Sequence, residues 1–163
     1  MLLSQQQKYP DAIKEEQEAI TISKDIPEAH INLGNAMMQS GRTEDAIGQY
    51  EQAVRIEPDF PKAHNDFGAT LLGLGRLPEA ISHFEQAVRL KPDFSEAHYN
   101  WGNALLELGR LQEAIGHYEQ ALRIRPDYAY AHNNWGLALE KLGREQEATM
   151  HWEQALRLKP DYA

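Results

Sequence analysis

The chain has 163 residues, 42% of them hydrophobic and 25% charged, which is typical of a folded protein with a continuous apolar core. Its formal net charge of −9 opposes the phosphate backbone of nucleic acids, so we expect no nucleic-acid partner. No apolar run approaches the roughly 18 residues of a membrane span, and the lack of cysteine excludes disulfides and thiolate metal sites. We therefore predict a cytoplasmic protein with no membrane partner.

The sequence repeats with a period of 34 residues. Related hexapeptides, HINLGN, HNDFGA, HYNWGN and HNNWGL, begin at residues 30, 64, 98 and 132. Placed in register, they define a partial block at 1–26, complete blocks at 27–60, 61–94, 95–128 and 129–162, and the start of another block at residue 163. Blocks 61–94 and 95–128 are identical at 19 of 34 positions, which indicates the same structural role. We predict one continuous array of stacked units.

Each block predicts two helices. In block 95–128 the first runs from Glu96 to Leu108 and ends before Gly109, a residue suited to a left-handed turn. The second runs from about Gln112 to Ile124 and ends before Pro126. The helix-ending residues at the same positions of the other blocks are Gly41, Gly75 and Gly143 for the first helix, and Pro58, Pro92 and Pro160 for the second. Asp93 and Glu96 have the spacing of a capping box at the start of the first helix.

Small and large residues alternate at helical spacing within each block. Glycines at 34, 68, 102 and 136 lie inside the first helix, where each costs about 1 kcal/mol relative to alanine. Such a cost predicts that another backbone comes close at these positions. The second helix has an aromatic residue between two alanines, for example Ala114, Tyr118 and Ala121, with Tyr50, Phe84 and Trp152 at the same place in other blocks. This pattern is typical of helix packing.

A 34-residue unit with this pattern of Leu-Gly or Trp-Gly, Ala, aromatic, Ala and Pro resembles the tetratricopeptide repeat, and the resemblance covers essentially the whole chain. It implies an all-α, right-handed superhelical solenoid of antiparallel helix pairs. One departure from the family pattern is histidine where the family usually has tryptophan, at His30, His64, His98 and His132. The missing bulk returns three residues later as Leu33, Phe67, Trp101 and Trp135, which we interpret as compensated core volume.

No catalytic or metal site is predicted. The seven histidines fall at only two repeat positions, so copies of one position point in parallel from helices roughly 8 to 10 Å apart and do not converge on one ion. The chain has no cysteine and no GxSxG elbow, and carboxylates that recur in every block are typical of a solvated surface. We therefore predict no enzymatic activity and no cofactor.

The remaining candidate is the face of the first helices that packing leaves free. In the tetratricopeptide repeat family, which this sequence resembles, this face lines the concave side of the solenoid, where peptides or partner helices bind. It is rich in asparagine, whose amide can both donate to and accept from an extended backbone, and we expect these amides to be free of contacts within the chain. The row resembles the asparagine ladder in the repeat domain of O-linked N-acetylglucosamine transferase. Asp66 interrupts it and should prefer a basic group unless Lys62 already satisfies it. The candidate peptide-binding residues are Asn32, Asn35, Met38, Asn65, Asp66, Tyr99, Asn100, Asn103, Tyr130, Asn133 and Asn134.

Three functions are compatible with these observations. The leading hypothesis is a non-enzymatic scaffold that binds a protein segment or peptide along the concave face. A second is the recognition arm of a larger enzyme, such as a glycosyltransferase, which the complete reading frame would reveal. A third is end-to-end homo-oligomerisation, because solenoids normally close their ends with a polar helix and the last predicted helix carries Trp152 and Leu156.

Overall fold

The computed structural model describes residues 13, 14, 18 and 26–162. Most of the partial block predicted at 1–26, and residue 163, lie outside them. The described residues form helices and contain no strand, which confirms the predicted all-α class. None of the helices in this part of the chain is long and apolar enough to cross a bilayer. The elements are α3 (Pro27–Gln39), α4 (Thr43–Ile56), α5 (Pro61–Gly73), α6 (Leu77–Leu90), α7 (Ser95–Glu107), α8 (Leu111–Ile124), α9 (Ala129–Lys141), α10 (Glu145–Leu158) and the short 3-10 helix η1 (Pro160–Tyr162).

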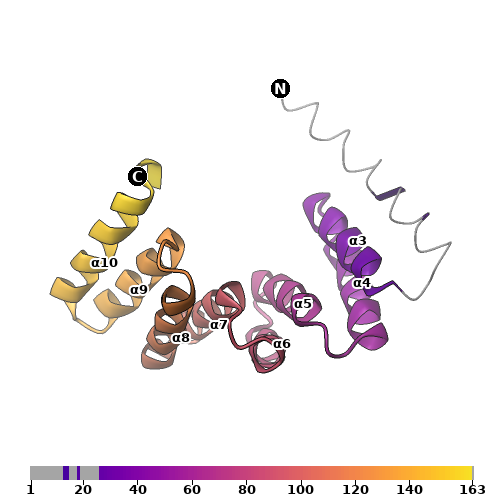
Figure 1. Cartoon of the computed structure of the whole chain (residues 1–163), viewed down its shortest axis with the longest axis horizontal. Helices are drawn as coiled ribbons and strands as arrows, with labels where there is room; N and C mark the ends of the chain where they lie inside the picture. The colour runs from indigo at the N-terminus through magenta and orange to yellow at the C-terminus, as the bar shows by residue number, and fades with distance from the viewer. Residues whose placement is uncertain (1–12, 15–17, 19–25, 163) are drawn as a thin grey trace.

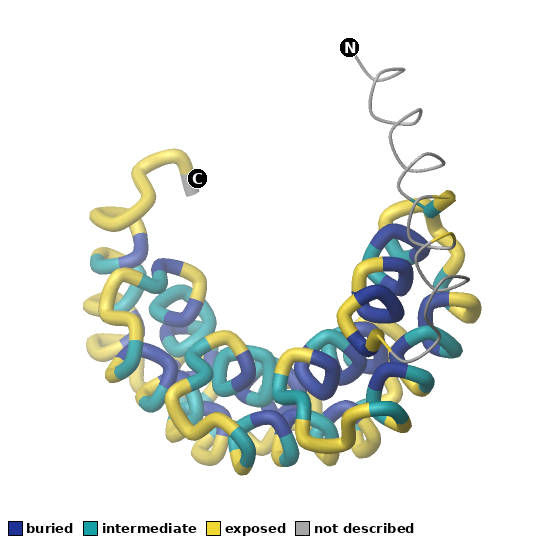
Figure 2. Tube along the Cα trace, turned by 45° about the vertical axis from the view of Figure 1, so that its right-hand side comes forward, coloured by how far each residue is buried: buried dark blue, intermediate teal, exposed yellow. Residues whose placement is uncertain are grey.

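The helices stack as antiparallel pairs along an arc (Figure 1). Each first helix packs on its own second helix and on the first helix of the next pair: α3 contacts α5, α5 contacts α7, and α7 contacts α9. The second helices α4, α6, α8 and α10 make no such contacts with one another. The first helices therefore form the inner side of the arc and the second helices the outer side. Buried residues run between these two layers (Figure 2).

Glycine ends the turn between the two helices of each pair, as predicted. Gly41, Gly75, Gly109 and Gly143 have φ between 71° and 79°, the left-handed region that a side chain disfavours. The predicted capping box is wrong. The residue that precedes α7 is Phe94, whose side chain makes no capping hydrogen bond, and Asp93 lies one residue too early to act as the cap.

An aromatic ring packs over the glycine inside each first helix. A Cβ added at Gly102 would lie 2.5 Å from Tyr118 Cε1, and one at Gly68 would lie 2.7 Å from Phe84 Cε1. Tyr50 and Trp152 cover Gly34 and Gly136 in the same way. Tyr118 and Phe84 are fully buried, as are the alanines on either side of them. The glycines thus admit a ring of the partner helix, whereas the sequence had suggested a backbone.

Histidines join the two helices of three pairs. His64 Nδ1 lies 3.0 Å from His83 Nδ1, and the same atoms are 3.2 Å apart in His98 and His117. His64 Nε2–H donates to the carbonyl of Pro58 at 2.9 Å. The Nδ1 of a neutral His64 must therefore accept, and His83 Nδ1–H must donate. In the third histidine pair, the Nδ1 atoms of His132 and His151 are 3.0 Å apart. In the helix pair α3–α4, Gln49 takes the place of the second histidine and contacts His30.

The second histidine of each pair also lies against the bulky residue that compensates for the missing tryptophan, stacked in two pairs and tilted in the third. Trp101 lies 3.9 Å from the ring of His117, Trp135 lies 4.0 Å from His151, and Phe67 lies 4.3 Å from His83. Burial, together with the neighbouring histidine, lowers the pKa of His83, His117 and His151 to about 4. Glu79, Glu113 and Glu147 oppose this shift only in part. These three histidines are therefore neutral at neutral pH.

Replacing Gly102 with alanine should destabilise the protein. The new methyl group clashes with the buried Tyr118 ring, and overpacking costs about 1 to 3 kcal/mol, more than the better helix propensity of alanine returns. Gly116→Ala is the matched control on α8: its Cβ meets nothing within 4 Å, so it should raise the unfolding free energy by about 1 kcal/mol. Urea unfolding followed by circular dichroism measures both. Shifts of the same sign would contradict the ring-over-glycine account.

Stability should fall as the pH is lowered from 7 to 5. Histidine in the unfolded chain has a pKa near 6.5, whereas His83, His117 and His151 have a pKa of about 4 in the folded chain. Between about pH 4 and 6.5 the unfolded chain therefore binds more protons than the folded chain. The unfolding free energy consequently falls as the pH is lowered through this range. The triple variant His83→Gln, His117→Gln, His151→Gln copies the glutamine of the first pair and should show a smaller loss. Thermal midpoints at the two pH values test this; an equal loss in both proteins would refute it.

Candidate functional site

The predicted residues all lie on the first helices, which form the inner side of the arc. Asn32 and Tyr130 are exposed, near its two ends. Asn65 is buried, with 1% of its surface exposed. The others are half-buried: Asn35, Met38, Asp66, Tyr99, Asn100, Asn103, Asn133 and Asn134. The structure brings most of this set into two hydrogen-bonded clusters.

The first cluster links α3, α5 and α7. Asn100 Nδ2 donates to Asn65 Oδ1 at 3.0 Å, and Asn65 Nδ2 donates to Asp66 Oδ1 at 3.1 Å. Asn35 Nδ2 lies 3.4 Å from Asp66 Oδ2 and its carbonyl accepts from the Tyr50 hydroxyl at 2.7 Å. Burial raises the pKa of Tyr50 to about 12, so this hydroxyl stays a donor. Three successive repeats are thus tied together through side-chain amides.

The second cluster links α7 and α9. Asn134 Nδ2 donates to Asn103 Oδ1 at 2.8 Å and to the Tyr99 hydroxyl at 3.2 Å. Asn103 Oδ1 also accepts from Tyr118 at 2.9 Å, and Asn133 donates to Asn134 at 3.0 Å. Tyr118 is the ring that covers Gly102. Packing within a pair and bonding between pairs therefore meet at Asn103.

The expectation that the amides are free of contacts within the chain is wrong for most of them. Asn35, Asn65 and Asn134 use both their donor and their acceptor groups in these clusters. Within the described part of the chain, the amide of Asn32, the carbonyl of Asn100 and the Nδ2 of Asn103 have no hydrogen-bond partner. The sequence shows which residues recur on one face, but inter-repeat bonds depend on how far each unit rotates against the next.

Asp66 is fully compensated, as the alternative for this residue anticipated. Lys62 Nζ lies 2.5 Å from its Oδ2, and two amides donate to the same carboxylate. Only 16% of the Asp66 side chain is exposed. A basic group on a partner is therefore not needed to satisfy it.

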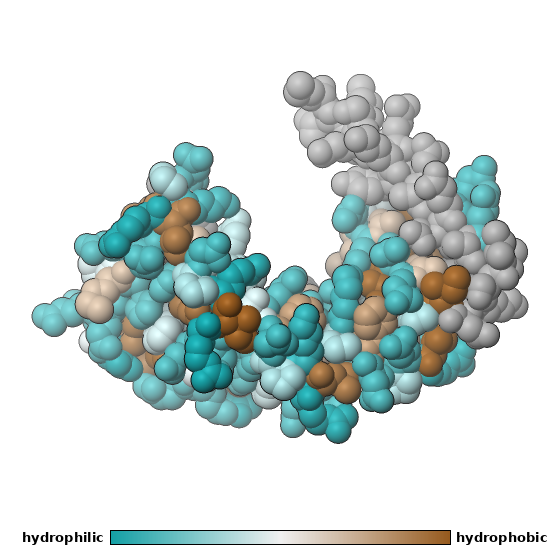
Figure 3. Space-filling model, viewed as in Figure 1, coloured by the Kyte–Doolittle hydropathy of each residue, from teal (hydrophilic) through white to brown (hydrophobic). Residues whose placement is uncertain are grey.

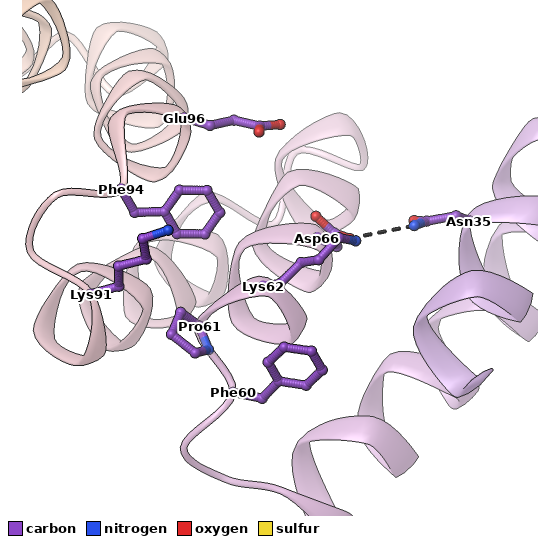
Figure 4. Close-up of a pocket in the computed structure, with 8 residues that line it drawn as sticks. All are labelled: Asn35, Phe60, Pro61, Lys62, Asp66, Lys91, Phe94 and Glu96. Atoms are coloured by element: carbon purple, nitrogen blue, oxygen red, sulfur yellow. Dashed lines mark hydrogen bonds and ion pairs between the residues drawn. The ribbon is translucent and has the colours of Figure 1, made fainter. Parts of the chain in front are cut away.

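Two cavities open on either side of the bond between Asn35 and Asp66. The larger, of about 540 Å³, extends toward the turns that precede α5 and α7, and the smaller, of about 310 Å³, is lined by Met38, Ala69 and Thr70. Figure 4 shows the rings of Phe60 and Phe94 at the larger cavity. These two residues and Lys91, which also lines the cavity, are not among those predicted from the sequence. An aromatic residue ends each of these blocks, at Phe60, Phe94 and Tyr128, and this recurrence could have indicated the cavity. It was interpreted only as part of the repeat.

The histidines lie closer together than the sequence suggested, but the described residues offer no set of metal ligands. The two histidine positions were considered separately in the sequence, whereas the fold pairs them across α5–α6, α7–α8 and α9–α10. Their facing nitrogens hydrogen-bond to each other. Among the described residues no group of three or more histidine or carboxylate side chains is placed to hold a metal ion.

Several solved structures share the fold over nearly the whole chain. MamA has 24% sequence identity and a TM-score of 0.83, with 93% of this chain and 89% of MamA covered. MamA from Desulfovibrio magneticus RS-1 has 21% identity and a TM-score of 0.83, with 94% and 87% covered. YrrB, described as a TPR protein with an unusual peptide-binding site, has 22% identity and a TM-score of 0.78, with 99% and 83% covered. At these identities the likeness concerns the fold. No curated protein matches the chain.

Family models match along the whole array. The model described as TPR repeat matches residues 2–41, 34–75, 68–109 and 102–143, and the model described as tetratricopeptide repeat matches residues 129–162. Together with the helix pairs, the left-handed glycines and the ring-over-glycine packing, these matches establish what the 34-residue period indicated. The chain belongs to the tetratricopeptide repeat family, and its fold is the all-α solenoid of that family.

Proposed function

We propose that the chain is a non-enzymatic interaction scaffold that binds an extended segment of a partner protein along the inner face of the first helices. The observation that carries this proposal is the pair of cavities that meet at Asn35 and Asp66, on the face where the candidate residues gather. The likeness to YrrB, which is described as having a peptide-binding site, supports a peptide as the ligand. A cytoplasmic location stays a prediction.

Energetics favour a contact surface that combines amides with apolar burial. Each hydrogen bond contributes about 0.5 to 1.5 kcal/mol net, whereas micromolar affinity needs about 8 kcal/mol. Few amide groups retain free donors or acceptors, so they cannot supply this alone. The side of the molecule seen in Figure 3 is mostly hydrophilic, with apolar residues in separate small patches. Binding should therefore depend on a few apolar side chains of the partner, each in its own cavity.

Alanine substitution in the amide clusters would confuse binding with stability. Removing Asn100, for example, leaves the buried carbonyl of Asn65 without its donor, and an unsatisfied buried group costs about 1 to 3 kcal/mol. A placed cross-linker avoids this problem, because the chain contains no native cysteine.

A photo-cross-linker on a single introduced cysteine should locate the partner segment. Ala69→Cys lines the smaller cavity, and Ser82→Cys on the outer helix α6 is a matched, near-isosteric control. Peptides selected from a phage-displayed random dodecapeptide library should form adducts with the first variant and not with the second, as read by mass spectrometry. Equal labelling of both variants, or selection of no peptide, would reject the proposal.

Association between copies is a second candidate. Leu156 on α10 is 47% exposed, whereas Leu122, the same residue one repeat earlier, is 8% exposed beneath α9. The side of α10 that carries Leu156 is thus equivalent to a surface that the following first helix covers elsewhere in the array, and a second copy that packs there would bury it.

Light scattering over a wide concentration range tests this association. The mass should rise with concentration, and Leu156→Glu should suppress the rise by placing a charge in an apolar contact. Leu108→Glu, at a site 42% exposed in the turn after α7, is the control and should leave the mass unchanged. A strictly monomeric mass at all concentrations would exclude the candidate.

A further inference from the structure

The larger cavity has apolar walls provided by two consecutive turns of the array. Phe60 immediately precedes α5 and Phe94 immediately precedes α7, and both are half-buried with their rings at the cavity (Figure 4). Its volume of about 540 Å³ is within the usual range of ligand pockets and is large enough for one bulky side chain of a peptide. An aromatic or large aliphatic side chain would bury its surface there against both rings.

Four charged side chains line this cavity, and two of them form an ion pair with each other. Lys62 and Asp66 form an ion pair at 2.5 Å and cancel each other. Lys91 and Glu96 also line the cavity, and neither forms an ion pair with any described residue. Lys91 Nζ lies over the Phe94 ring, 5.3 Å from its centre, in a cation–π contact that still leaves the charge without an anionic partner. Figure 4 shows Lys91 and Glu96 on opposite sides of that ring.

The equivalent cations in the later turns also lie over aromatic rings, but those rings carry hydroxyl groups. Arg125, one repeat after Lys91, stacks on Tyr128 with its guanidinium carbon 3.3 Å from the ring centre. Lys159, one repeat further, donates to the Tyr130 hydroxyl at 2.7 Å. In the preceding repeat the same position is Glu57. The turn at Lys91 thus combines a cation without an ion pair with two phenyl rings that have no hydroxyl group.

We infer that this cavity takes one large apolar side chain of the partner, flanked in the partner sequence by an acidic residue on the Lys91 side and a basic residue on the Glu96 side. This inference rests on the proposed function and specifies its ligand. In an extended segment, residues two positions apart point the same way and lie about 7 Å from each other. The charged residues should therefore stand two positions before and two positions after the apolar one.

The order of charges gives the site a polarity that can be measured. We would compare two labelled peptides of identical composition, Gly-Asp-Ala-Phe-Ala-Lys-Gly and Gly-Lys-Ala-Phe-Ala-Asp-Gly, by fluorescence anisotropy at low salt. One order should bind several-fold more tightly, because two exposed ion pairs are each expected to change affinity by up to about fivefold. Replacing the central phenylalanine with alanine should weaken the better peptide about tenfold or more.

Charge exchange on the protein then identifies the residues responsible. The double variant Lys91→Glu with Glu96→Lys should invert the preferred peptide order. The double variant Glu119→Lys with Arg123→Glu, which exchanges two exposed charges on the outer helix α8, should leave it unchanged. Both pairs are at the surface, so both variants should keep the circular dichroism of the parent. Phe94→Leu should weaken both peptides while leaving their order intact.

The outcomes separate this inference from the proposal on which it rests. Inversion in the first double variant alone supports it. Equal affinity for the two orders, an order that does not invert, equal binding of the alanine peptide, or no measurable binding of either peptide overturns it. If the library-selected peptides still cross-link to the Ala69→Cys variant in that case, binding along the inner face stands and only the assignment of this cavity is lost. Absence of cross-linking as well would remove both.

Discussion

The packing of an aromatic ring over a helical glycine is the interaction on which the rest of the array depends. It brings the two helices of each repeat close together, and the missing side chain makes room for a fully buried ring. Because the same contact recurs every 34 residues, each repeat has the same shape and can stack on the next. The first helices contact each other in sequence and the second helices do not, so the array curves with its first helices inside.

The inner face has a structural role and a proposed binding role, and the two share side chains. Asn35, Asn65, Asn103 and Asn134 bond one repeat to the next, while the cavities beside them remain open. A satisfied amide adds little affinity, since any new bond must replace an existing one. We therefore expect the apolar walls of the larger cavity and the two charges without ion pairs, Lys91 and Glu96, to discriminate between ligands more strongly than the asparagines do.

The fold was predictable because its signals are local and repeated. Gly109 ends a turn, Pro126 follows a helix, and Tyr118 between alanines marks the buried stripe, and each of these is visible in any one repeat. The face that carries the candidate residues was equally predictable from helical spacing. The capping box failed because spacing alone does not place Asp93 against the first turn; the residue that immediately precedes α7 is Phe94.

The sequence by itself determined the period, the helix pairs, the glycines within and after the first helices, and the set of side chains on the inner face, because these follow from residue size and helical periodicity. The tertiary structure decided which of these side chains touch. It paired histidines 19 residues apart, bonded Asn100 to Asn65, and opened a cavity between Phe60 and Phe94. Such contacts depend on the distance and rotation between neighbouring helices, which many small packing interactions set together and no single repeat encodes.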